Sequence, residues 1–596
     1  MYKLYSKSVP QMVLTAVLTT SILAACTPTK QPGESRSQID IFPVYEEDTV
    51  ITVEKKNIPD DAITSLPASI TKDSIRKNYT EKSKQRPHRM ESTSLYSGGV
   101  MPQAMPSIRA PGEAVERENY NHFDDNKIKL VAESPVSTFS IDVDTGSYSN
   151  IRRMINSGQL PREDAVRVEE LINYFSYTYP LPEAKKTPFS VTTEMGVTPW
   201  NSGSRLLHIG IKGYDVEHAE LPASNLVFLV DVSGSMNSPE KLGLLKSALK
   251  LLTKQMRAED KISIVVYAGA SGVVLEPTAA NKSATIVRAL DSLSAGGSTN
   301  GAAGIRSAYQ LAEQAFIKDG INRVILATDG DFNVGTVNFE ALKDLIEEKR
   351  KTGISLTTLG FGTGNYNDHL MEQLADAGNG NYSYIDTLNE AQKVLVDEMS
   401  STLNIIAKDV KIQLEFNPAV VAEYRLIGYE NRALNREDFN NDNIDAGEIG
   451  AGHSVTALYE VTLADSEHRA IDPLRYDRQV ASDDSYSDEL AYLRLRYKEP
   501  DANNSKLIEQ VVKTSEIKTR IADTSDRYRF SASVASFGQI LRGGKYTGEF
   551  DYDDILTLAR SSRGKDSFGY RGEFISIVNL ARSLSSNTKV EIQASR

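Results

Sequence analysis

Five oxygen-bearing side chains are the best candidates for chemistry in this sequence. They are two carboxylates and three hydroxyls, namely Asp231, Ser233, Ser235, Thr299 and Asp329. The first three alternate directly after an apolar segment at 225–230, and the last follows a second apolar segment at 323–328. The threonine stands in a glycine-rich loop just before a helical pattern. Because ligands of an open α/β sheet gather beyond the carboxyl ends of its strands, we expect all five to converge at one sheet edge.

This set of hard oxygen donors suits a divalent cation. Magnesium prefers near-octahedral oxygen geometry, keeps several waters and usually takes one or two carboxylates from the protein. We therefore predict a Mg²⁺ site with one position open, and Mn²⁺ or Ca²⁺ as the alternative ions. A plainer interpretation is that Asp231 and Ser233 cap the next helix and Asp329 forms a turn. That interpretation leaves two carboxylates together at a partly buried edge without a counter-ion, which is costly.

The region between residues 225 and 406 predicts the elements that would position these side chains. Short apolar segments alternate with helical patterns, such as the one at 239–256, whose leucines recur on one face. Buried apolar strands that alternate with helices indicate an α/β fold with a doubly wound, mostly parallel sheet. One helix, from Asn389 to about Ile406, is predicted to close the region.

Alternating patterns typical of strands flank this region on both sides. They lie at 189–197, 205–214, 410–416, 422–429, 454–463 and 489–497. We infer that the α/β domain is inserted into a β-sandwich, and that the chain ends in helices at 551–558 and 570–583. The stretch from Thr27 to about Lys129 is rich in Pro, Ser, Gly and charge, so it predicts a disordered tether.

A chain of 596 residues is too long for one compact core, so several parts are expected. The predicted division is a signal peptide at 1–25, a disordered tether at 26–130, a flanking domain of helices and first sandwich strands at 131–224, the α/β domain at 225–406, and a β-sandwich and helical domain at 407–596.

The N-terminus resembles a secretory signal that ends in a lipobox. A basic start precedes the apolar run 12–23, which closes on small residues before Cys26. The run is shorter than the ~20 residues that a spanning helix needs. The resemblance implies cleavage, acylation of Cys26 and anchoring to a bacterial envelope membrane. Thr27 argues against inner-membrane retention, so the outer membrane is expected if the cell has two. The alternative is an uncleaved terminus with a chance cysteine.

Composition and missing motifs exclude several classes of function. A net charge of −13 opposes non-specific binding to nucleic acid, and a single cysteine excludes internal disulfides. The seven histidines show no zinc spacing, and no G-x-S-x-G motif is present. A second metal at Asp142 and Asp144 is disfavoured because turn capping explains both. The stretch 438–449 fails as a calcium loop because it lacks the required glycine and final glutamate.

The order D-x-S-x-S, threonine and T-D-G resembles the metal-ion-dependent adhesion site of von Willebrand factor A domains. The resemblance covers the whole central region. It implies that Ser233, Ser235 and Thr299 bind the metal directly or nearly so, and that Asp231 and Asp329 act partly through water. It also implies that a carboxylate of a protein partner completes the coordination.

The flanking sequences look like those of bacterial YfbK-like lipoproteins. The similarity is carried by residues 137–148 and 167–175 before the central region, and by 530–541 and 570–581 near the end. This resemblance implies architecture and location more than activity.

Three functions are weighed from the sequence. The first is a binding module that engages an acidic side chain of a protein partner through the metal, with the helix at 389–406 coupling the metal edge to the sandwich. The second is a structural envelope protein in which the ion only stabilises the domain. The third, an enzyme with a metal-activated water, is disfavoured because no general base accompanies the predicted ligands. The sequence favours the binding module.

Overall fold

The computed structural model describes residues 118–183, 187–268, 271–297, 301–330, 339–472 and 486–594, with side chains described as far as residue 586. The chain divides into the units Met1–Pro106 and Ser107–Arg596, and every described residue belongs to the second. The predicted signal peptide, Cys26, Thr27 and Thr299 lie outside the described residues.

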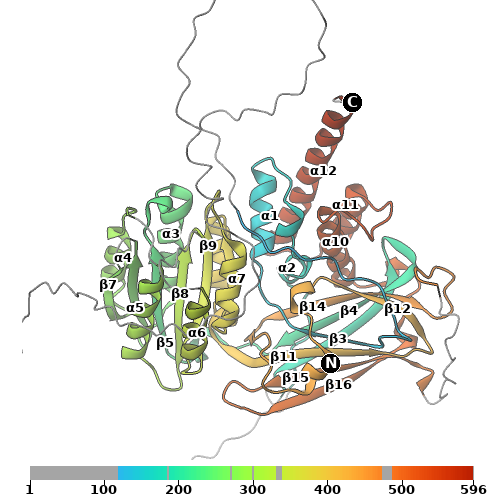
Figure 1. Ribbon diagram of the computed structural model, residues 1–596, viewed down its shortest axis with the longest axis horizontal. Helices are drawn as coiled ribbons and strands as arrows, with labels where there is room; N and C mark the ends of the chain where they lie inside the picture. The colour runs from blue at the N-terminus through green and yellow to red at the C-terminus, as the bar shows by residue number, and fades with distance from the viewer. Residues whose placement is uncertain are drawn as a thin grey trace, which may run out of the picture. The chain divides into compact units, whose positions relative to one another are not determined.

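A six-stranded sheet forms the α/β domain, in the strand order β10-β9-β8-β5-β6-β7 (Figure 1). Its strands are β5 (Ser224–Asp231), β6 (Lys261–Tyr267), β7 (Ser271–Ala279), β8 (Ile321–Thr328), β9 (Ser355–Phe361) and β10 (Tyr382–Ile385). All neighbours are parallel except β7, which pairs antiparallel to β6. The doubly wound, mostly parallel sheet predicted from the sequence is therefore confirmed.

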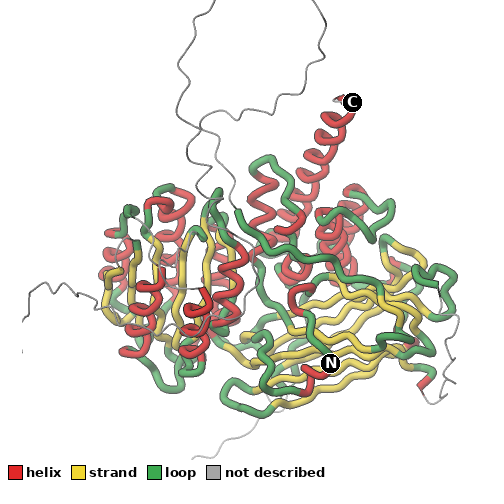
Figure 2. Tube along the Cα trace, viewed as in Figure 1, coloured by secondary structure: helices red, strands yellow, loops and turns green. Residues whose placement is uncertain are grey.

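Helices cover both faces of this sheet, because its strands are apolar on both sides (Figure 2). On β5, Phe228 packs toward one helical layer and Leu229 toward the other. The first layer holds α3 (Leu244–Gln255), α4 (Ser283–Ser292), α8 (Leu388–Gln392) and α9 (Met399–Leu403). The second holds α5 (Gly301–Gln314), α6 (Phe339–Arg350) and α7 (Asp368–Ala377).

Two antiparallel sheets enclose a second core. One has the order β1-β12-β14-β4-β3, and the other has the order β13-β11-β15-β16, with β2 paired to β11. The strands are β1 (Lys129–Leu130), β2 (Val136–Ser140), β3 (Phe189–Thr198), β4 (Asn201–Gly213), β11 (Ile405–Phe416), β12 (Val421–Ile427), β13 (Ile449–Gly450), β14 (Ser454–Leu463), β15 (Glu489–Lys498) and β16 (Ser505–Lys513). Since β4 precedes the α/β domain and β11 follows it, the predicted insertion into a β-sandwich is confirmed.

Five helices form a third core against the outer face of the first sandwich sheet. They are α1 (Gly146–Asn156), α2 (Val168–Asn173), α10 (Asp526–Leu541), α11 (Tyr552–Ser561) and α12 (Tyr570–Ala594). Their aromatic side chains, including Phe530 and Phe574, pack with Leu206 and Leu458 of the sheet. The helical C-terminal part predicted from the sequence is thus confirmed.

Two sequence predictions need correction. The helix predicted from Asn389 to Ile406 is broken: α8 continues as a π-helical turn, Lys393–Asp397, and α9 follows a kink at Glu398. Strand β11 already begins at Ile405, because its backbone pairs with β13, so the predicted boundary at 406/407 falls inside a strand.

The predicted end of the disordered tether, at residue 130, is also too late in the chain. Tyr120 is buried, and its hydroxyl accepts a hydrogen bond from Asn150 of α1. Leu130 lies in β1, which pairs with β12. Residues 118–130 are therefore part of the folded body, held by contacts to segments that are distant in the sequence.

Candidate metal site

Asp231, the last residue of β5, anchors the candidate site. Its carboxylate accepts hydrogen bonds from the Ser233 backbone at 2.8 Å, the Thr328 hydroxyl at 2.8 Å and the Tyr267 hydroxyl at 3.2 Å. All three donors are uncharged. Burial raises the pKa of this carboxyl group, and the bonds from Ser233 and Thr328 lower it in part. The arrangement fixes the orientation of the carboxylate.

The two serines of the motif lie together. The hydroxyl oxygens of Ser233 and Ser235 are 3.0 Å apart, so both can bind one ion. Their loop is tied to the next one by backbone hydrogen bonds from Gly234 to Gly297 at 3.1 Å and from Gly296 to Val232 at 2.7 Å. The chain that leads to Thr299 is thus seated against the serine loop, while Thr299 itself lies outside the described residues.

Asp329 follows β8, the neighbour of β5, and is fully buried. Lys241 donates a hydrogen bond to its Oδ2 at 2.7 Å. The next residue, Gly330, has a φ of +83°, and a Cβ there would overlap Asn367. The glycine of the T-D-G motif is therefore required for a tight turn that packs on the loop after β9.

The described members of the predicted set, Asp231, Ser233, Ser235 and Asp329, occupy one edge of the sheet, as adjacent strands β5 and β8 require. The donors fit a hard divalent ion. No three His, Cys, Asp or Glu side chains among the described residues converge as a metal site. The predicted site needs only two carboxylates and takes its other donors from hydroxyls.

A buried ion-pair seam, which the sequence did not reveal, lies along the other half of the same edge. Arg152 of α1 donates hydrogen bonds to Asp386, which follows β10, and to Glu390 of α8, the latter at 2.7 Å. Arg167 pairs with Asp368 of α7. These arginines expose 3% and 1% of their side chains. The flanking helices therefore neutralise the carboxylates that follow β9 and β10.

The segment that enters the folded body joins this seam. The backbone of Asn119 donates to Tyr366 at 2.9 Å and accepts from Asp368 at 3.1 Å. Glu118 accepts hydrogen bonds from Arg153 and from the backbone of Gly364. The loop after β9 is thus held by the flank on one side, while its other side contacts Gly330 of the metal motif.

Arg432 accounts for the aspartates that the sequence had raised as a second metal site. It lies 3.1 Å from Asp142 and 3.5 Å from Asp144. The backbone of Asp144 also donates to Asp142 at 2.9 Å, which is the turn contact expected from capping. Both aspartates therefore have structural partners.

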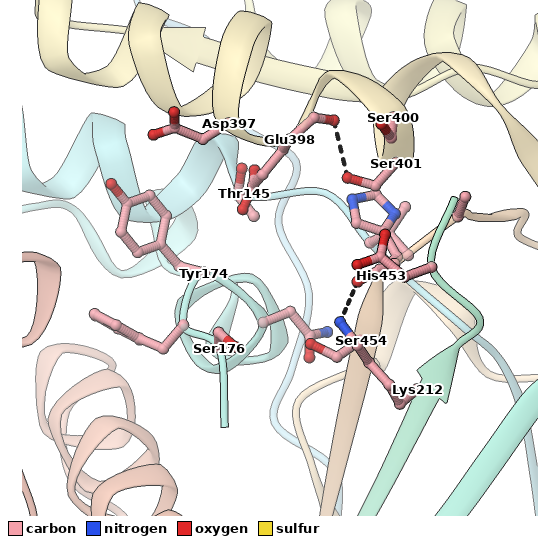
Figure 3. A pocket seen from close by; sticks show the side chains of 16 residues that line it. Thr145, Tyr174, Ser176, Lys212, Asp397, Glu398, Ser400, Ser401, His453 and Ser454 are labelled. Atoms are coloured by element: carbon pink, nitrogen blue, oxygen red, sulfur yellow. Dashed lines mark hydrogen bonds between the residues drawn. The ribbon is translucent and has the colours of Figure 1, made fainter. Parts of the chain in front are cut away.

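A polar cavity of about 200 Å³ opens where the last helix of the α/β domain breaks. Glu398 and Ser400 line it from the helix, and Lys212 and His453 line it from the sandwich (Figure 3). Burial lowers the pKa of His453 to about 3, so its ring is neutral at pH 7. The cavity marks the junction through which the α/β domain meets the sandwich.

None of the described helices is both long and apolar enough to cross a membrane.

Comparison with known proteins supports the fold described for the α/β domain and its flanks. Residues 225–397 match the von Willebrand factor type A domain, 114–208 match a family described as von Willebrand factor, and 401–584 match the C-terminal region of uncharacterized protein YfbK. Von Willebrand factor type A domains are typically protein-interaction modules.

Relatives cover most of the chain. It is 49% identical to uncharacterized protein YfbK of Escherichia coli K12 over 482 residues, which span 80% of this chain and 82% of that protein. Uncharacterized protein sll0103 of Synechocystis is 27% identical over 217 residues, 36% of this chain and 50% of that protein. A von Willebrand factor type A structure from Catenulispora acidiphila is 15% identical, with a TM-score of 0.36 over 67% of this chain and 91% of that one. The chain belongs to the YfbK-like family of proteins that carry a von Willebrand factor type A domain.

Proposed function

We propose that this protein is a metal-dependent protein-binding module, anchored to the bacterial envelope through a lipid on Cys26. The observation that carries the proposal is the pair of serine hydroxyls 3.0 Å apart beside the buried carboxylate of Asp231. Hydroxyls and carboxylates gathered at the carboxyl edge of a doubly wound sheet form a site for a hard cation.

In this proposal, Ser233, Ser235 and Thr299 bind the ion, and Asp231 and Asp329 hold it partly through water. When bound, the ion supplies an electrophilic centre with one position for a carboxylate oxygen of the partner. The protein's own part is orientation: Thr328 and Tyr267 fix Asp231, and so the donors are arranged before the ion arrives. Mg²⁺ is preferred because hydroxyls outnumber carboxylates, and Mn²⁺ and Ca²⁺ are the alternatives.

We infer binding rather than catalysis. Hydrolysis by a metal-bound water needs a general base within hydrogen-bond reach. Among the described titratable groups of this edge, Asp231 and Asp329 are the predicted ligands, and Tyr267 donates its hydroxyl proton to Asp231. Lys241 donates to Asp329. A lysine that donates to a carboxylate cannot accept a proton from water, so the edge is suited to capturing a ligand.

The first experiment is a cross-linked pull-down from intact cells with the wild-type chain, Asp231→Ala and Asp291→Ala. Asp291 is an exposed carboxylate on α4 of the same domain and serves as the matched control. We expect a partner to be captured by wild type and Asp291→Ala in Mg²⁺, and to be lost in Asp231→Ala and after a chelator wash.

A partner that survives both Asp231→Ala and the chelator would contradict metal-dependent binding. The structural alternative, in which the ion only stabilises the domain, would then be favoured if chelation still lowers the melting temperature. Circular dichroism of each purified variant separates loss of binding from loss of folding.

The lipid anchor has its own test. Cys26→Ser removes the thiol that would be acylated. We expect the wild-type chain to incorporate labelled palmitate and to sediment with membranes, and the variant to do neither. Equal labelling of the two chains would contradict the anchor, without bearing on the metal site.

A further inference from the structure

Lys241 reaches into the candidate metal site. It belongs to the π-helical turn Pro239–Gly243 that precedes α3, and its side chain exposes only 11% of its surface. The ammonium group lies 2.7 Å from Asp329 Oδ2 and 3.3 Å from Asn365 Oδ1. The positive charge is therefore placed on one of the two carboxylates predicted to hold the metal.

The path of this side chain is built into the fold. Its stem runs over Gly362, where a Cβ would overlap the Cγ, Cδ and Cε atoms of the lysine. Gly362 has a φ of +76°, a conformation that residues with a side chain rarely adopt. The loop after β9 thus leaves a channel for Lys241, and Asn365 in the same loop holds its tip.

The surface lysine Lys250 is placed differently. Lys250 of α3 pairs with Asp291 on the surface, where the two side chains expose 31% and 56% of their area. Such an exposed pair is screened by water and contributes little. Lys241 and Asp329 are both buried, so their interaction is stronger and the position of the ammonium is fixed.

We propose that Lys241 competes with the divalent cation for Asp329. The lysine must give up its contact with this carboxylate when the ion binds. This inference rests on the proposed function, because it assumes a metal at this edge. An ammonium and a divalent cation that share one carboxylate repel each other, and even with the dielectric constant of water the repulsion weakens metal binding by roughly ten-fold.

The competitor has two consequences for the chain. Without metal, Lys241 places a positive charge against the buried Asp329, so the empty edge stays folded. With metal, the ammonium lowers the affinity of the edge for the bare ion. Tight metal binding then requires the additional negative charge that an acidic partner brings.

The test is a titration of the purified full chain with MgCl₂ by isothermal calorimetry, after removal of metal by a chelator. Lys241→Met and Lys241→Gln remove the charge and keep a stem of similar length. Lys250→Met removes one charge at a surface pair of α3, the helix that follows the turn of Lys241, and is the matched control. Thermal unfolding of each chain with and without Mg²⁺ reports folding.

We expect both Lys241 variants to bind Mg²⁺ at least about ten-fold more tightly than wild type. We also expect them to melt earlier than wild type without metal and to gain more from its addition, while Lys250→Met follows wild type. Affinity that is unchanged or weaker in both Lys241 variants would overturn the competitor role and leave the proposed function standing. Failure of every chain to bind a divalent ion would overturn the proposed function and the competitor role together.

Discussion

The carboxyl edge of the six-stranded sheet holds its buried carboxylates in two different settings. On the half formed by β9 and β10, Asp368 and Asp386 face arginines from the flanking helices. On the half formed by β5 and β8, Asp231 accepts hydrogen bonds from uncharged groups, and Asp329 is held by Lys241. One half is closed by arginine ion pairs, and the other is the half that we propose exchanges Lys241 for a cation.

This difference explains how one sheet edge can hold the domain against its flank and also offer a place for a ligand. An arginine makes several directional hydrogen bonds and stays charged at all accessible pH values, so it suits a fixed seam. A single lysine makes a point contact on a flexible stem and can be displaced. Hydroxyls beside the aspartates add donors for a metal without adding charge. The seam therefore fixes the domain against its flank, while in our proposal the other half stays available to a metal and a ligand.

The largest effect is expected from breaking the seam. Arg167→Met keeps an unbranched apolar stem but leaves Asp368 and Glu170 without their guanidinium partner in a buried setting. Removal of one member of a buried ion pair costs about 3–5 kcal/mol of unfolding free energy. Urea denaturation followed by circular dichroism measures the loss.

The control for this change is an exposed pair. Arg520 and Asp523 lie three residues apart on the surface, with exposed fractions of 75% and 38%. Arg520→Met is expected to change stability by about 0–1 kcal/mol. A seam variant that loses no more stability than the surface variant would remove the contrast between a fixed and an exchangeable half.

A smaller effect is expected from filling the metal half. Mg²⁺ at about 100 times its dissociation constant stabilises the form that binds it by about 2.7 kcal/mol. The melting temperature of wild type and of Asp291→Ala should therefore rise with added Mg²⁺, and that of Asp231→Ala should not. A rise of equal size in Asp231→Ala would place the responsible ion elsewhere in the chain and break the comparison.

The gathering of Asp231, Ser233, Ser235 and Asp329 at one edge could be predicted from the sequence because its parts are local. Asp231, Ser233 and Ser235 follow one apolar strand within five residues, and each strand end carries its own signal. Parallel pairing of β5 and β8 then brings Asp329 to the same edge. The fold class followed from the same alternation of apolar strands and helices.

The seam could not be predicted because its partners are far apart in the chain. Arg167 and Asp368 are separated by 201 positions, and Arg152 and Glu573 by 421. Nothing near either arginine indicates which carboxylate it meets. The sequence did not predict the edge strands β7 and β16 for a different reason, because exposed positions interrupt their apolar pattern. The proposed role of Lys241 could not be predicted either, because it depends on the passage of its stem over Gly362, which is distant in the sequence.

The sandwich offers a third way to bury titratable groups, which is to keep them neutral. His208 is fully buried between the sandwich sheet and the helices, with Tyr179 at 2.7 Å from Nε2 and Ser531 at 3.0 Å from Nδ1. Burial lowers its pKa from 6.5 to about 3. The folded chain therefore resists protonation that the unfolded chain accepts, so this contribution to stability is full above pH 6.5 and falls as the pH drops toward 3.

Between pH 7 and pH 5 the loss from His208 alone is about 2 kcal/mol. His208→Gln should flatten the pH dependence of the unfolding free energy by that amount. His122→Gln removes a mostly exposed ring whose pKa is raised by Asp164, so it should not flatten this dependence. Urea denaturation at pH 7, 6 and 5 gives the pH dependence of the unfolding free energy for wild type and for each of the two variants. If His208→Gln retains the full acid sensitivity, the sensitivity must come from another buried group, and His453 is the first candidate because burial also lowers its pKa to about 3.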